Sequence, residues 1–149
     1  MAVMIMTVGV ALAMPPKERK PWVDHSSPPP GLGSEYASQH FSTVGFALLP
    51  NSHLEVIHRC ESGDFHNGTD GWLVLRFFNG DQLLGTRIQE CHTPRKQNGS
   101  QNQIKLIKED LDLSAVISQI TAVEYEFIHG TGEGRPNPGL PELPALPKL

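Results

Sequence analysis

One stretch decides the fold: Gly71-Trp72-Leu73-Val74-Leu75-Arg76-Phe77-Phe78-Asn79-Gly80-Asp81-Gln82-Leu83-Leu84-Gly85-Thr86-Arg87-Ile88-Gln89-Glu90-Cys91. Two runs rich in apolar and β-branched residues flank an Asn-Gly pair. Such a pair favours a tight β-hairpin, because both central turn residues need a positive φ, which Asn and Gly tolerate best. With Asn79-Gly80 as a two-residue loop, Phe77 is expected opposite Gln82, Leu75 opposite Leu84 and Leu73 opposite Thr86.

Further strands are expected on both sides of this hairpin. The candidate segments are Phe41–Leu49, His53–Cys60, Gln103–Lys108 and Ile120–His129, and a helical turn with Ser114 as its N-cap is expected within Asp110–Gln119. Eleven of the 13 prolines lie before residue 35 or after residue 135, and proline cannot donate to a sheet ladder. The sequence therefore predicts an all-β fold, a small antiparallel β-sandwich of immunoglobulin-like type, over residues 36–130.

Proline-rich extensions are expected to flank the sandwich. Residues 14–35 are predicted to be a flexible linker, and residues 131–149 a Gly/Pro-rich tail in which Pro-x-Leu occurs four times. In a polyproline II conformation the leucines of the tail would line one edge. The tail is thus either a spacer or a strip that docks into a groove.

Residues 1–13 are uncharged and apolar and end in Ala11-Leu12-Ala13. This small-residue pattern predicts a signal peptide and a secreted or periplasmic protein. The stretch lacks a basic start and is short, so a first strand is the alternative interpretation. It is shorter than the roughly 20 apolar residues that span a bilayer, and we expect no stable membrane insertion.

Cys60 and Cys91 are the only two cysteines. In a small exported domain an even number of cysteines indicates a disulfide. The alternative is a pair of buried thiols that pack as small apolar groups.

The formal net charge is −4, and no stripe of Lys and Arg runs along the chain. A partner made of nucleic acid is therefore not expected, because there is nothing to neutralise the phosphates.

Ligand contacts are expected from the loops 61–70 and 92–102 and from the aromatic face of the hairpin. The candidate ligand-binding residues are Asp64, His66, Asp70, Trp72 and Phe78. The expected ligand is a protein or a glycan. The sequence offers no catalytic motif and no metal or cofactor signature, which predicts a non-catalytic binding or structural module. Two alternatives stay open: a metal-dependent or hydrolytic enzyme that uses the His/Asp-rich region 58–92, and an inhibitor or immunity-type protein. Asn67 and Asn98 begin glycosylation sequons in predicted loops.

The segment Val74-Leu75-Arg76-Phe77-Phe78-Asn79-Gly80-Asp81-Gln82-Leu83-Leu84-Gly85-Thr86 resembles the hairpin of bacterial immunoglobulin-like modules of the FxLYD kind. The cysteine pair and the turn around Ser114 depart from that pattern. The resemblance implies a β-sandwich with a surface-binding or spacer role and no catalytic residues.

Overall fold

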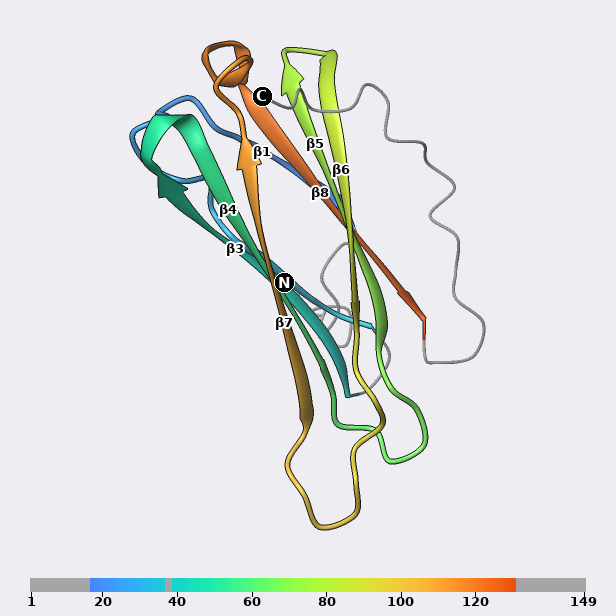
Figure 1. The fold of residues 1–149 in the computed structure, drawn as a ribbon. Helices are drawn as coiled ribbons and strands as arrows, with labels where there is room; N and C mark the ends of the chain where they lie inside the picture. Colours follow the sequence, from blue (N-terminus) through green and yellow to red (C-terminus); the bar gives the residue numbers. More distant parts are fainter. Residues whose placement is uncertain (1–16, 37–38, 131–149) are drawn as a thin grey trace, which may run out of the picture.

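The computed structural model describes residues 17–36 and 39–130, which form two antiparallel four-stranded sheets (Figure 1). The strands are β1 (Lys17–Pro21), β2 (Leu32–Glu35), β3 (His40–Leu49), β4 (His53–Ser62), β5 (Asp70–Asn79), β6 (Gln82–His92), β7 (Gln103–Asp112) and β8 (Ala122–Gly130). Their order is β1-β8-β5-β6 in the first sheet and β2-β3-β4-β7 in the second. The prediction of an all-β antiparallel sandwich is confirmed.

The chain crosses between the sheets repeatedly. The hairpins β3–β4 and β5–β6 belong to different sheets, and β7 and β8 then return to pair with β4 and β5. This is a Greek-key connectivity, the kind found in immunoglobulin-like sandwiches. The connections between sheets place the β4–β5 and β6–β7 loops together at one end, the lower end in Figure 1.

The turn of the central hairpin lies one residue later than expected. Asn79 lies opposite Gln82, so Gly80 and Asp81 form the loop, and Gly80 supplies the positive φ of 58°. Asn79 remains extended as the last residue of β5. The prediction of Asn79-Gly80 as the loop is therefore wrong.

A β-bulge between Phe77 and Phe78 shifts the register of this hairpin further. The observed partners of Leu73, Leu75 and Phe77 are Gln89, Arg87 and Gly85, in place of the predicted Thr86, Leu84 and Gln82. The bulge changes which face of β6 points toward the second sheet. Arg87 and Gln89 of β6 both donate to Glu109 of β7, a strand of the second sheet.

The predicted linker is wrong for residues 17–35, because these residues include two strands and a buried tryptophan. Trp22 is 3% exposed, and its backbone N–H donates to the carbonyl of Thr121 at 2.9 Å. The hydroxyl of Tyr125 donates to the carbonyl of Pro30 at 2.7 Å. Pro21 ends β1 and Pro28–Pro30 lie between strands, where no ladder N–H is needed. The predicted signal peptide and tail lie outside the described residues.

The helical turn after β7 is present but shorter than expected. It is the 3-10 turn η3 (Ile117–Gln119), which has no side-chain cap, so the prediction of Ser114 as N-cap is wrong. Ser114 instead bonds Asp112 through its backbone and hydroxyl groups. A second 3-10 turn, η2 (Pro50–Ser52), joins β3 to β4. Within the described residues no helix is long and apolar enough to cross a membrane.

Inward-facing side chains from both sheets build one hydrophobic core. Its buried members are Trp22, Val44, Leu54, Val56, Leu73, Leu75, Phe77, Leu111, Leu113, Ile120, Val123, Tyr125 and Phe127. Along β3 and β4 the inward positions change from apolar to polar toward the lower end, where His40, Ser42, His58 and Ser62 are buried. The core is therefore apolar at one end of the sandwich and polar at the other.

Candidate binding site

A disulfide joins the two sheets at the polar end of the sandwich. Cys60 of β4 and Cys91 of β6 are bonded, with their Cα atoms 6.1 Å apart, and both are buried. This confirms the disulfide prediction. We call this region the disulfide end, and it comprises the cross-link, the adjacent ends of β2–β8 and the β4–β5 and β6–β7 loops.

His40 is buried beside the cross-linked strands and is bonded through both ring nitrogens. Thr69 donates its hydroxyl proton to the carbonyl of Glu61 at 2.8 Å, so its oxygen accepts from His40 Nδ1 at 2.7 Å. His40 Nε2 lies 3.0 Å from Asp64 Oδ2. Hydrogen bonds from the His66 backbone and from His40 lower the pKa of Asp64 to about 2, so this carboxylate is ionised. His40 therefore links Thr69 and Asp64 through its two ring nitrogens.

This hydroxyl, imidazole and carboxylate resemble the groups of a nucleophile triad in their order. A triad requires the hydroxyl proton to point at the imidazole, which takes it as a base. Here the Thr69 proton points at a backbone carbonyl, and both Thr69 and His40 are buried. The arrangement therefore fastens the β4–β5 loop to β3 and does not activate Thr69.

Two further histidines lie at this end, on β4 and on β8. His58 is fully buried, and neither of its ring nitrogens has a hydrogen-bond partner. Burial lowers the pKa of His58 to about 4, and the charges of His129 and His92 act in the same direction. Burial also lowers the pKa of His129 to about 4, with His40 as the second cause. Both rings are therefore neutral at pH 7.

His92 lies on the outer side of the cross-link, at the end of β6. Its Nδ1 is 2.7 Å from Asp70 Oδ1, and its Nε2 is 3.0 Å from Glu90 Oε1. Its ring and that of Trp72 form a T-shaped contact, with the centroids 5.6 Å apart. The carboxylate of Asp70 is thus engaged by a neighbouring strand.

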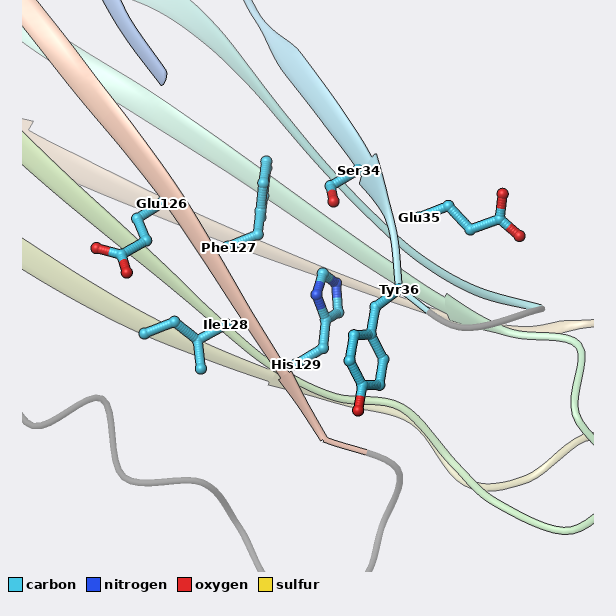
Figure 2. Close-up of a pocket in the computed structure, with 7 residues that line it drawn as sticks. All are labelled: Ser34, Glu35, Tyr36, Glu126, Phe127, Ile128 and His129. Atoms are coloured by element: carbon cyan, nitrogen blue, oxygen red, sulfur yellow. The ribbon is translucent and has the colours of Figure 1, made fainter. Parts of the chain in front are cut away.

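A hollow of about 380 Å³ opens between the ends of β2 and β8 (Figure 2). It is lined by Ser34, Glu35, Tyr36, Glu126, Phe127, Ile128 and His129. The rings of Tyr36 and His129 stack at 5.2 Å with 9° between their planes. Figure 2 shows Glu126 pointing to the other side of β8 from His129, and there its carboxylate pairs with Arg76 at 2.9 Å. The stacked rings therefore form an aromatic wall of the hollow.

The β4–β5 and β6–β7 loops are joined by backbone hydrogen bonds. Thr93 N–H donates to the carbonyl of Thr69 at 2.9 Å, and Lys96 N–H donates to that of Asp64 at 2.8 Å. Gly68 fits between them because a Cβ there would lie 1.9 Å from the carbonyl oxygen of Thr93. The two loops form one unit, residues 61–70 and 93–102, which we call the tip.

The five ligand-binding residues expected from the sequence do not form one cluster. Asp64 and Asp70 lie at the disulfide end, where they hold His40 and His92, and His66 is exposed in the tip. Trp72 also lies at this end but is 5% exposed. Phe78 lies near the other end of β5, is 8% exposed, and is covered by the Arg19 guanidinium at 3.7 Å.

Sequence reasoning missed Tyr36, His40 and His129 of the disulfide end. It did not single out Phe65, Arg95 or Lys96, although these lie in the two loops from which ligand contacts are expected. Tyr36 and His129 are far apart in the chain, and their rings meet only because the two sheets pack face to face. One signal was available: on β4 the inward side changes from Leu54 and Val56 to His58. A strand that changes in this way indicates which end of a sandwich carries buried polar groups.

No group of three or more His, Cys, Asp or Glu side chains within residues 17–36 and 39–130 is arranged to hold a metal ion. Comparison of the chain with protein-family models, with curated proteins and with solved structures gives no match.

Proposed function

We propose that the protein is an exported, non-catalytic β-sandwich module that binds a protein or glycan ligand through its disulfide end. One observation carries this proposal. Two loops that are bonded to each other stand beside a hollow with an aromatic wall, at the end where a disulfide holds the sheets together. Loops fixed on a rigid scaffold are a common position for binding residues.

Export is supported by the disulfide and by the sequence. Disulfides persist in oxidising compartments and are rare in the cytosol. The apolar start that ends in Ala11-Leu12-Ala13 fits the same route. The resemblance of the central hairpin to that of immunoglobulin-like modules of the FxLYD kind supports a surface-binding or spacer role.

Intact-mass spectrometry of protein secreted by its native source tests export. We expect cleavage after Ala13 and the loss of two hydrogens for the Cys60–Cys91 bond. A full-length cytosolic protein with two free thiols would contradict this part of the proposal.

Binding through the disulfide end is tested by blocking each end of the sandwich in turn. Two single-cysteine substitutions supply labelling sites: Gln101→Cys in the tip and Gln119→Cys in η3 at the opposite end. Both positions are exposed. Each variant is alkylated with the same bulky maleimide and applied to glycan, peptide and protein arrays. We expect the tip label to abolish binding and the η3 label to preserve it. Equal effects of the two labels, or no binding by the unlabelled protein, would contradict the proposal.

A further inference from the structure

The tip presents an exposed aromatic residue that both cations of the β6–β7 loop contact. Phe65 is 44% exposed. Arg95 Nη1 donates to the carbonyl oxygen of Phe65 at 3.2 Å, and Lys96 Nζ lies 5.1 Å from the centroid of its ring. The backbone N–H of Lys96 donates to the carbonyl of Asp64, which anchors this residue beside the segment that carries Phe65.

The acidic side chains of the tip have partners within the protein, whereas its two cations form no ion pair with the described residues. All three carboxylates of residues 61–70 already have a basic side chain beside them: Glu61 pairs with Arg59 at 2.9 Å, and ring nitrogens of His40 and His92 lie 3.0 Å from Asp64 and 2.7 Å from Asp70. Residues 93–102 contain no Asp or Glu. Within the part of the chain that the structure describes, neither Arg95 nor Lys96 forms an ion pair.

We propose that Phe65, Arg95 and Lys96 bind an acidic segment of a partner protein. Carboxylates of the segment pair with the guanidinium and the ammonium group, and an apolar side chain of the segment packs on the phenyl ring. This inference rests on the proposed binding function, for which it names the ligand class. Complementary charge around an exposed aromatic anchor is a common pattern at protein interfaces.

Two cations fit a peptide better than a polyanion or a membrane. Surfaces that bind anionic lipid by charge carry about four to eight Lys and Arg residues. Nucleic acids are held by many phosphate contacts, more than two cations provide. A short acidic segment needs only the two charges and the ring that the tip presents.

A peptide array tests the inference, with 12-residue sequences in which acidic, basic, polar and apolar positions are varied. The protein is compared with Arg95→Glu/Lys96→Glu, with Phe65→Ser, and with Lys105→Glu/Lys108→Glu. The last variant is the matched control, because it reverses two exposed charges on β7 and leaves the tip unchanged. Circular dichroism and thermal unfolding establish that each variant is folded. Heparin, polyphosphate and phosphatidylserine vesicles are tested as alternative anions.

We expect the protein to select peptides that combine acidic and apolar residues. Reversal of the tip charges should lower affinity for them about tenfold or more, and Phe65→Ser about tenfold, while the β7 control stays within about twofold. Array peptides that bind equally well to the tip variants would overturn this inference and leave the proposed binding function standing. Tighter binding to heparin, polyphosphate or vesicles than to any peptide would overturn it as well. Binding to no probe in any array would overturn both proposals.

Discussion

The two ends of the sandwich interior are built from the same strands but from different chemistry. At one end, β4 and β5 contribute Leu54, Val56, Leu75 and Phe77 to an apolar core. At the disulfide end, the inward residues are His58 and Ser62 of β4 together with His40 and Ser42 of β3. Burial of apolar area stabilises the first end, whereas a covalent bond and hydrogen bonds stabilise the second.

This difference indicates how stability and binding are divided along the strands. Buried polar groups are costly unless they are hydrogen-bonded, and His58 has no partner for either ring nitrogen. A protein keeps such an end at a cost in stability, and the loops and the hollow lie there. We infer that the apolar end maintains the fold and that the disulfide end carries the binding surface.

The largest expected effect comes from the apolar end. Phe77→Ala removes a fully buried ring from the core and should lower the free energy of unfolding by about 3–5 kcal/mol. Urea denaturation measures this loss, and Leu106→Ala on the outer face of β7 is the control, because that side chain is 48% exposed. A loss no larger than that of the control would show that the apolar end does not dominate stability.

Removal of the disulfide should have the next largest effect. The bond closes a loop across 31 residues, and Cys60→Ala/Cys91→Ala should lower the free energy of unfolding by about 3–4 kcal/mol in the chain-entropy model. Hydrogen exchange should increase most in the tip and least around Phe77, since the cross-link lies at the polar end. A uniform increase in exchange along β5 would contradict the division between the two ends.

Acid should weaken the fold through the neutral histidines. The pKa of His58 is about 4 in the folded protein and about 6.5 in the unfolded chain, so the unfolded state binds the proton first as the pH falls. The stabilisation is fully present above about pH 6.5 and is lost as the pH falls to about 4. The shift corresponds to about 3 kcal/mol for His58, and His129 acts in the same direction. Urea denaturation at a series of pH values measures this loss.

His58→Leu separates the contribution of His58 from general acid effects. This variant should reduce the dependence of stability on pH between 6.5 and 4 and leave the part that His129 contributes. At pH 7 it should be at least as stable as the parent, because no unpartnered ring nitrogen is left buried. The control is His53→Leu, since His53 lies on the outer face of β4 and bonds Asp110. An unchanged pH profile in the His58 variant would contradict the assignment.

The fold was predictable from the sequence to a large extent because alternating apolar runs and a turn signal depend on local chemistry. The strands of residues 40–130 follow such runs, and the two cysteines lie near strand ends. The register of the β5–β6 hairpin was not predictable, because the alternating pattern of residues 71–91 carries no local signal for the bulge between Phe77 and Phe78. Strand β1 was missed because its Cα partners lie about a hundred residues later on β8.

The candidate site was less predictable than the fold. Loop 61–70 was recognised from its polar and glycine-rich composition, but its fastening to loop 93–102 depends on two backbone hydrogen bonds between distant segments. The stacking of Tyr36 on His129 likewise follows from the positions of β2 and β8 in different sheets. Composition thus indicates which segments are loops, and tertiary pairing determines which of them meet.

The smallest expected effect on stability is at the junction of the two tip loops. In Gly68→Ala the new Cβ would collide with the carbonyl of Thr93, which is backbone and cannot rotate away, so the loops must separate. We expect a loss of about 2 kcal/mol, faster hydrogen exchange in residues 61–70 and 93–102, and unchanged exchange in the apolar core. Gly45→Ala is the matched control, because a Cβ there meets no atom within 4 Å. If the two variants exchange alike, the loops are not one unit, and the binding surface would have to be assigned to the hollow alone.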